Sequence, residues 1–357
     1  MRRHLPAIGV ALASAAGAAG HPAADAPPPA FPSQVLDNGR VRMTLHLPDA
    51  EAGFYRGPRF DWSGMIARVE AAGHVYYGPW KTPHDPAGND CAIGPAEEFG
   101  MTRPVGYDEA EPGGLFPKIG VGLLAKESAS DPSKKAAYGF WKPYVIARPG
   151  VWRVAVDPGA IVFEQSLAAP GGYGYRYAKR IVLVPGADAF VIERRLENTG
   201  TRPIVTDHYN HNFTVIDGTP VGPDYRVVYG VAPGPGTGDP PAFAVEAKKP
   251  HSLGGFAEVR GRELVFTAAL PPGRAIHAHL LGFPAAMPYA FAIENRKTGA
   301  SVRVRGERPP ARAAIYAVCS AVCPEPFIDI DLAPGAVLAW RTEYVLESRA
   351  PAGAAIR

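Results

Sequence analysis

The stretch DNGRVRMTLHL, at residues 37–47, decides the fold class. Asn38-Gly39 favours a tight hairpin turn, because both residue types tolerate positive φ. After this turn, Val41, Met43 and Leu45 alternate with polar or charged residues. A period of two places the apolar side chains on one face of an extended strand. The stretch therefore predicts a β-hairpin with one buried face.

The same alternation recurs along the chain, at 302–305, 328–332 and 338–344. Turn signals such as Pro185-Gly186 and Pro334-Gly335 separate these segments, and the 40 glycines and 39 prolines suit many short strands. No stretch has a convincing amphipathic helical pattern of useful length. We therefore predict an all-β protein built as a large two-sheet β-sandwich.

The N-terminus has the features of a secretory signal peptide. Arg2 and Arg3 precede a short apolar segment at 5–16, and Ala16-Gly17-Ala18 is a small-x-small cleavage site. We predict a signal peptide at 1–18 and a flexible Pro/Ala-rich lead-in at 19–32. A single β-sandwich domain is expected at 33–350 and a tail at 351–357. The mature protein is expected to be secreted or periplasmic.

Composition excludes several classes of partner. The net charge is only +3 on 357 residues, and no Lys/Arg cluster stands out, so nucleic acid is not an expected ligand. No segment is long and apolar enough to predict a membrane span. Oligomeric state is not indicated.

Two groups of residues invite a metal or disulfide hypothesis. An exported protein could form one disulfide among Cys91, Cys319 and Cys323, or carry three unpaired buried thiols, and both alternatives remain open. His277 and His279 share one face of a strand, but no acidic or histidine partner is apparent in the sequence. We interpret them as a solvated or half-buried pair and predict no metal site.

The stretch TDHYNHNF, at residues 206–213, carries the functional signal. Alternation places Tyr209, His211 and Phe213 on one face of a strand and His208, Asn210 and Asn212 on the other. Polar groups on both faces indicate a strand that is exposed or lines a polar cleft. Aromatic rings stack on the C–H face of a sugar, while amides and imidazoles bond its hydroxyls. The stretch therefore favours a carbohydrate ligand.

Together with LENTG at 196–200, this stretch resembles the aldose 1-epimerase (galactose mutarotase) family. The segments YRGPRFDWSGMI at 55–66 and PEPFIDI at 324–330 resemble the opening and closing regions of the same superfamily. The resemblance implies a galactose mutarotase-like sandwich that needs no cofactor. Its expected ligand is a mono- or oligosaccharide.

The resemblance also implies roles for individual residues. His211 matches the family's general acid, and Glu325 matches its base by order along the chain. The stretch that carries the family's second histidine is absent, so His84 is the candidate stand-in, and the neighbouring segment at 94–100 is acidic where that histidine is expected. Glu97 and Glu98 are therefore alternative bases. The residues expected to contact substrate are Arg59 (with Arg56 as a rival), His84, Glu97, Glu98, Tyr209, Asn210 and Trp80.

Three functions are compatible with these residues. The leading hypothesis is an epimerase that interconverts the anomers of an aldose by general acid/base ring opening. The second is a non-catalytic carbohydrate-binding module on the same fold. The third is a carbohydrate lyase or hydrolase that uses acidic residues among Glu97, Glu98 and Glu325.

Overall fold

The computed structural model describes residues 31–128, 137–230 and 243–349. The predicted signal peptide and the predicted tail lie outside these residues, so both stay predictions. The first strand begins at Ser33, where the domain is expected to start. Among the described residues, no helix is long and apolar enough to cross a membrane.

The predicted N-terminal hairpin is confirmed. β1 (Ser33–Asp37) and β2 (Val41–His46) pair antiparallel around Gly39, whose φ is 83°. Val41, Met43 and Leu45 are fully buried, whereas Arg42 is exposed. The hairpin continues into β3 (Met65–Ala71) and β4 (His74–Tyr76), which complete a four-stranded sheet in the order β1-β2-β3-β4.

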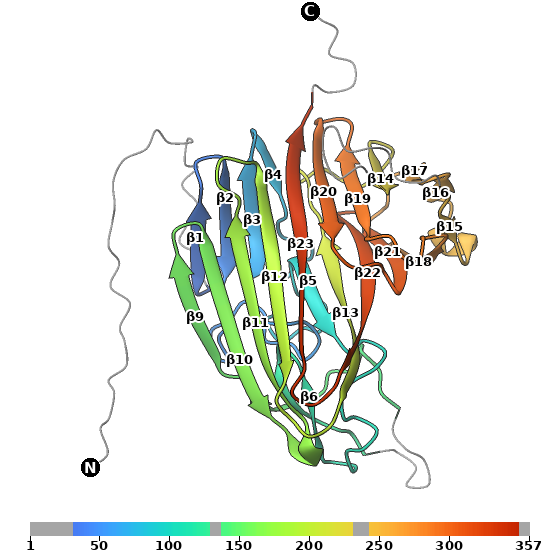
Figure 1. Cartoon of the computed structure of the whole chain (residues 1–357). Helices are drawn as coiled ribbons and strands as arrows, with labels where there is room; N and C mark the ends of the chain where they lie inside the picture. Colours follow the sequence, from blue (N-terminus) through green and yellow to red (C-terminus); the bar gives the residue numbers. More distant parts are fainter. Residues whose placement is uncertain (1–30, 129–136, 231–242, 350–357) are drawn as a thin grey trace, which may run out of the picture. The chain divides into compact units, whose positions relative to one another are not determined.

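The largest sheet has ten strands in the order β16-β17-β14-β19-β20-β23-β12-β11-β10-β9. The long arrows of β9 to β12 and β23 lie side by side in Figure 1. The strands of this ten-stranded sheet are β9 (Trp152–Asp157), β10 (Ala160–Ala168), β11 (Gly174–Leu183), β12 (Ala189–Asn198), β14 (Tyr225–Tyr229), β16 (Ala257–Arg260), β17 (Glu263–Phe266), β19 (Ala290–Asn295), β20 (Ala300–Gly306) and β23 (Val337–Ser348).

A six-stranded sheet carries the sequence stretch that favours a sugar. Its order is β15-β18-β21-β22-β13-β5, so β13 pairs with β22 on one side and β5 on the other. Its strands are β5 (Gly94–Phe99), β13 (Ile204–Phe213), β15 (Glu246–Ala247), β18 (Ala275–Leu281), β21 (Arg312–Val318) and β22 (Ala321–Leu332).

The remaining elements are short. β6 (Leu115–Lys118), β7 (Gly122–Ala125) and β8 (Ile146–Pro149) form a three-stranded sheet. Two 3-10 turns, η1 (Pro170–Gly172) and η2 (Pro250–Leu253), are the helical segments of the described residues. Every strand pair in these sheets is antiparallel, as expected for hairpin-connected strands joined by Gly/Pro-rich turns.

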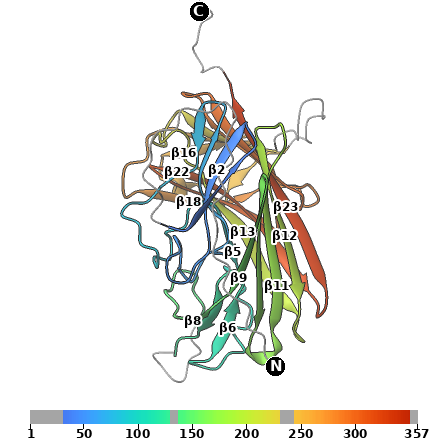
Figure 2. The same cartoon turned by 90° about the vertical axis from the view of Figure 1, so that its left-hand side faces the viewer.

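The ten-stranded sheet packs against the other two large sheets. One core cluster joins Val41 and Met43 of β2 to Phe163 and Ile181 of the ten-stranded sheet, and it extends to Ile315 of β21. Figure 2 separates β11, β12 and β23 from β5 and β13, which lie behind them in Figure 1. The fold is therefore an all-β sandwich, as predicted, whose second layer consists of a four-stranded and a six-stranded sheet.

A further cluster covers the other face of the six-stranded sheet. Tyr209 and Phe213 of β13 pack there with Phe60 of the loop before β3, and with Phe116 and Leu124 of the three-stranded sheet. Loops and a small sheet thus cover the β5–β13 end of this face. This covered end holds most of the residues predicted to bind substrate.

Gly94 starts β5 and allows a close backbone approach. Its φ is +69°, and a Cβ at this position would lie 2.4 Å from the backbone oxygen of Ile66. Gly186 has the same φ of +69° but nothing within 4 Å of its would-be Cβ. Replacing either glycine with alanine therefore carries the cost of a positive φ. Of the two replacements, the one at Gly94 adds a steric clash.

We predict that Gly186→Ala lowers the free energy of unfolding by about 1–2 kcal/mol through φ strain alone. Gly94→Ala should lose at least about 1 kcal/mol more, because its methyl group overlaps buried backbone. Urea unfolding followed by circular dichroism measures both. Equal losses would contradict the close packing of β3 against β5.

Candidate functional site

Strand β13 has two polar faces, and both are buried. From Thr206 to Phe213 every residue is buried. Register with β22 and β5 places Tyr209, His211 and Phe213 on the face covered by loops, and His208 and Asn210 on the face toward the ten-stranded sheet. The predicted alternation is therefore correct, and it divides the polar residues between two separate environments.

His211 and Glu325 form the central contact on the loop-covered face. His211 Nε2 lies 3.0 Å from Glu325 Oε1, and the two side chains are only 7% and 4% exposed. The other ring nitrogen, Nδ1, is buried and has no hydrogen-bond partner. A buried nitrogen without a partner is costly unless a ligand or water completes it. The pair thus offers one unused polar atom beside a carboxylate.

Aromatic rings hold the imidazole of His211. Phe213 stacks on it at 4.0 Å with an angle of 12° between the planes, and Trp80 stacks on Phe213 at 4.5 Å. Phe60 and Tyr316 present their edges at 5.8 and 5.3 Å. These contacts fix the plane of the ring, which is what a proton-transferring group requires.

The pair also sets the charge of Glu325. Burial opposes ionisation of this carboxyl, but the charge and hydrogen bond of His211 outweigh it, with smaller contributions from His277 and Arg59. The net result is a pKa of Glu325 below its ordinary value of 4.5. Glu325 is therefore a carboxylate at neutral pH and can accept a proton.

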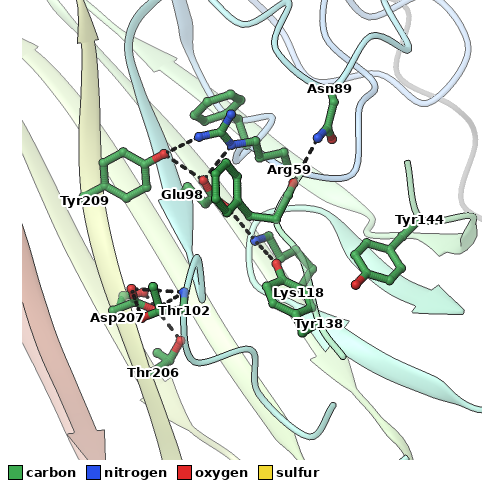
Figure 3. Close-up of polar contacts among 12 residues, drawn as sticks. Arg59, Asn89, Glu98, Thr102, Lys118, Tyr138, Tyr144, Thr206, Asp207 and Tyr209 are labelled. Atoms are coloured by element: carbon green, nitrogen blue, oxygen red, sulfur yellow. Dashed lines mark hydrogen bonds and ion pairs between the residues drawn. The ribbon is translucent and has the colours of Figure 1, made fainter. Parts of the chain in front are cut away.

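Arg59, Glu98 and Tyr209 form a second group beside His211. Arg59 Nε donates to Glu98 Oε2 at 2.8 Å, Arg59 Nη2 donates to the Tyr209 hydroxyl at 2.8 Å, and that hydroxyl donates to Glu98 Oε2 at 2.8 Å. Lys118 Nζ donates to Glu98 Oε1 at 3.0 Å. Figure 3 shows Tyr209, Arg59 and Lys118 converging on Glu98. Both oxygens of Glu98 are thus engaged, and it serves to hold Arg59 and Tyr209.

One side of Arg59 reaches toward solvent. Its Nη1 pairs with Asp90, whose side chain is 50% exposed. The rings of Phe60 and Phe140 each lie 4.5 Å from the guanidinium carbon. The rival residue, Arg56, instead donates to the backbone oxygen of Glu51 at 2.6 Å. Arg59 is therefore the arginine that the fold brings to His211, through the shared ring of Phe60.

Glu97 and Asn210 do not join this site. Adjacent residues of a strand point to opposite faces, so Glu97 faces the ten-stranded sheet, where it is fully buried. Arg194 Nε donates to Glu97 Oε1 at 2.9 Å, and Asn210 Nδ2 lies 3.3 Å from the same oxygen. The expectation that Glu97 and Asn210 contact a sugar beside His211 does not agree with this placement.

The face toward the ten-stranded sheet holds a charge network around Glu97. Lys179 lies 3.6 Å from Glu97 and 2.9 Å from Asp61, and His208 Nε2 lies 3.2 Å from Glu97. Although burial opposes its charge, Arg194 and Lys179 hold the pKa of Glu97 well below its ordinary value. Burial lowers the pKa of His208, which keeps that ring neutral. Two carboxylates and two cations thus balance one another between the sheets.

Two further predicted residues lie in other surroundings. His84 stacks on Phe54 at 3.8 Å, and its Nε2 lies 2.7 Å from the backbone oxygen of Phe54. It belongs to a ring cluster with Phe31 and His46, so the structure does not bring it to Glu325. Trp80 donates to the backbone oxygen of Ala92 and reaches His211 only through Phe213.

The chain is similar to known proteins in its structure rather than in its sequence. No protein-family profile and no curated protein sequence matches the chain. Several solved structures resemble it at low sequence identity. The Slr1438 protein from Synechocystis sp. PCC 6803 has a TM-score of 0.52 at 12% identity, covering 89% of this chain and 96% of its own.

Two others carry descriptions that name an activity. An Escherichia coli K12 protein assigned as an aldose 1-epimerase has a TM-score of 0.50 at 13% identity, covering 89% of this chain and 99% of its own. A galactose mutarotase related enzyme from Lactobacillus acidophilus has a TM-score of 0.50 at 10% identity, covering 88% and 97%. This chain has the galactose mutarotase-like fold. At such identities the likeness concerns the fold and not the activity.

Within the galactose mutarotase-like fold, the sequence reasoning missed Lys118 and Tyr138. Lys118 is 2% exposed and donates to Glu98 at 3.0 Å and to the Tyr138 hydroxyl at 3.2 Å. It stands in the apolar run LFPKIGVGLL at 115–124. A lone lysine inside a buried strand needs a carboxylate partner. A charged residue within this apolar run could therefore have indicated a buried partner for Glu98.

The metal and cysteine hypotheses have plain outcomes. The described residues contain no group of three or more His, Cys, Asp or Glu that could hold a metal ion. Cys91, Cys319 and Cys323 are all free, in agreement with the alternative of unpaired thiols, except that Cys319 is half-buried whereas the other two are buried. His277 and His279 are exposed, with ring centroids 5.3 Å apart.

The charge network gives a stability prediction. Glu97→Gln removes the carboxylate that Arg194 and Lys179 share, leaving the buried Arg194 without its carboxylate partner while Lys179 keeps Asp61. We expect it to cost about 3–5 kcal/mol of unfolding free energy. Glu193→Gln is the matched control, because Glu193 pairs with Arg180 on the exposed face of the same sheet, each 44% exposed. That loss should stay below about 1 kcal/mol.

Urea unfolding of both variants beside the wild type measures this difference. A Glu97→Gln midpoint equal to that of Glu193→Gln would contradict the assignment of Glu97 to a buried structural network.

Proposed function

We propose that the protein binds an aldose and interconverts its anomers by general acid/base catalysis. The observation that carries this proposal is the contact between His211 and Glu325, at 3.0 Å, with Nδ1 of the imidazole unused. The pair lies on a sheet face among aromatic rings, within a galactose mutarotase-like fold. Rings and hydrogen-bonding side chains together suit a hydroxylated ring.

The proposed reaction moves only protons. Glu325 takes the proton of the anomeric hydroxyl through its second oxygen, Oε2. His211 donates the proton on Nδ1 to the ring oxygen. The bond between C1 and the ring oxygen breaks, giving an open-chain aldehyde. Rotation about the bond to C1, followed by the reverse transfers, closes the ring on the other face of the carbonyl and restores both groups.

The proposed acid and base contact each other directly. The anomeric hydroxyl and the ring oxygen are bonded to the same carbon, C1. Two groups in contact can therefore serve both oxygens from one side. Because the two side chains are only 7% and 4% exposed, the sugar reaches them as the surrounding rings move aside.

Arg59 gives the proposed site a further hydroxyl partner. Glu98 and Tyr209 fix its position from the buried side, while Asp90 engages it from the exposed side. A sugar hydroxyl can replace the half-exposed Asp90 without disturbing the buried contacts. Arg59 would then orient the ring, and Glu98 would act through it as a positioning residue.

The activity prediction concerns the two central residues. His211→Ala and Glu325→Gln should each lower kcat/KM for mutarotation by about 10²–10⁴-fold, because each removes one proton-transfer group. Polarimetry of freshly dissolved α-D-galactose and α-D-glucose measures the rate, with Glu193→Gln as the folded control. Unchanged rates in both variants would remove these roles.

Other outcomes of the same experiment would point to the alternative functions. Sugar binding without acceleration would indicate a non-catalytic carbohydrate-binding protein. Release of products from an oligosaccharide would indicate a hydrolase or lyase.

The pH prediction follows from the direction of the pKa shift of Glu325. The base must be ionised, and its pKa is held below 4.5, so its ionised fraction persists as the pH falls to that value. We expect kcat/KM, corrected for uncatalysed mutarotation, to keep more than half of its plateau value at pH 4.5 and to decline only below it. Circular dichroism at each pH checks that the fold persists. An acid limb with its midpoint above 4.5 would contradict the assignment of Glu325 as base.

A further inference from the structure

Strand β9 is a free edge of the ten-stranded sheet. It is the last strand in the sheet order, and among the described residues its one strand partner is β10. Figure 1 shows β9 at the margin of the sheet. An edge strand presents unpaired backbone N–H and C=O groups, which can pair with a strand of another chain. Every residue from Arg153 to Asp157 is exposed, so the described part of the chain leaves this edge uncovered.

β9 lacks the features that usually prevent pairing at a sheet edge. Natural edge strands are protected by lysine, proline, β-bulges or a short length. β9 has six residues, WRVAVD, and pairs with β10 without a bulge. The opposite edge of the same sheet, β16, has only four residues, and its Glu258 and Arg260 pair with each other. Of these two edges, β9 is therefore the one suited to a further strand.

The inner face of β9 extends the apolar core beyond its covered part. Val154 is paired with Phe163 of β10, and Val156 is paired with Ile161. Directly paired residues of antiparallel strands point to the same face. Phe163 and Ile161 are fully buried, whereas Val154 and Val156 are 39% and 48% exposed. The two valines therefore leave apolar surface that a neighbouring strand can cover.

The outer face of β9 carries two opposite charges without an ion-pair partner among the described residues. Arg153 and Asp157 are both exposed, and Arg153 lies opposite Glu164 in the register without forming an ion pair with it. On neighbouring strands of the same face, by contrast, Arg180 and Arg195 each pair with a glutamate of their own chain. The charges of β9 are thus available to another chain.

The order of these residues makes β9 complementary to an antiparallel copy of itself. A two-fold axis through Ala155, perpendicular to the sheet, pairs each residue with the one equally far beyond Ala155 in the second copy. Arg153 then lies opposite Asp157 of the second copy, and Val154 lies opposite its Val156. Paired residues point to the same face, so valine meets valine on the inner face and opposite charges meet on the outer face.

We propose that the protein forms a two-fold symmetric dimer in which the β9 strands of two copies pair antiparallel about Ala155. The two ten-stranded sheets then become one continuous sheet. The contact of Arg153 with Asp157 occurs twice by symmetry, and the valines of both copies cover one another. An interface of one strand from each copy is small, so the dimer dissociates on dilution. This inference goes beyond the proposed function, and its test does not depend on mutarotation.

The first test measures the mass of the full chain in solution. Analytical ultracentrifugation from about 1 to 100 μM chain should show a mass that rises from one chain toward two. Arg153→Asp places an aspartate opposite Asp157 of the second copy, and Asp157→Arg places an arginine opposite its Arg153. Each variant alone should raise the dissociation constant about tenfold or more, because two attractive contacts become repulsive.

Mixing the two charge variants tests the register itself. In a mixed dimer every arginine at these positions again lies opposite an aspartate, so the equimolar mixture should recover dimers with a dissociation constant within about threefold of the wild type. Asp331→Arg is the matched control, because it reverses an exposed aspartate on β22, a strand inside the six-stranded sheet. This control should dimerise as the wild type does.

A second pair of variants tests the apolar face. Val154→Lys places a charge among the paired valines and should also raise the dissociation constant about tenfold or more. Val337→Lys is its control, because Val337 is 46% exposed on β23, which lies inside the ten-stranded sheet. That variant should keep the dissociation constant of the wild type.

Three results would overturn the proposal. The first is a wild type with the mass of one chain at every concentration. The second is a dimer that neither charge variant weakens, because its contact would then lie elsewhere. The third is a mixture of the charge variants that stays monomeric while circular dichroism shows both to be folded.

Discussion

The buried ion pair between Glu97 and Arg194 is the constraint on which the candidate site depends. It joins β5 to β12 across the interior of the sandwich, where neither charge can be left without a partner. Glu97 is paired with Asn210 in the β5–β13 register. Fixing Glu97 therefore fixes the register of β13, and a slip of one residue would turn every side chain to the other face. His211 reaches the loop-covered face because Glu97 is held on the opposite one.

The adjacent carboxylate, Glu98, repeats this logic on the other side of the strand. Three donors, from Arg59, Lys118 and Tyr209, hold its two oxygens. Each donor comes from a different segment, so Glu98 ties the loop before β3 and the three-stranded sheet to β13. The loops that cover His211 are thus attached through charge as well as through aromatic packing. Glu325 is left as the carboxylate that contacts His211.

Sequence reasoning reached the fold because alternation is a local signal. Val41, Met43 and Leu45 show the buried face of β2 within six residues, and Ile328 and Ile330 do the same for β22. It also reached His211 and Arg59 through short motifs and Glu325 by its order along the chain, and the structure brings these three to one face. The TDHYNHNF stretch was predicted to be exposed or to line a polar cleft. Both of its faces are polar, but every residue from Thr206 to Phe213 is buried, because loops cover one face and the ten-stranded sheet covers the other.

The parts that were missed depend on contacts between distant segments. All six residues of β5 are buried on one face or the other. The sequence therefore shows no polar/apolar alternation that would place Glu97 on the face toward the ten-stranded sheet and Glu98 on the face that holds the site. His84 was chosen by its place in the chain, but its ring packs with Phe31 and Phe54 instead. The contact between His211 and Glu325 joins two strands 114 positions apart along the chain, counted from 211 to 325. Nothing local in the sequence of β13 indicates Glu325 as a neighbour.

The central claim is that an aldose binds with its C1 beside the contact between His211 and Glu325. A crystal structure of the protein soaked with D-galactose tests this most directly. The account predicts density for the ring beside this contact, with the anomeric hydroxyl at Oε2 of Glu325 and the ring oxygen at Nδ1 of His211. Density for the sugar at another surface, with the rings around His211 unmoved, would contradict it.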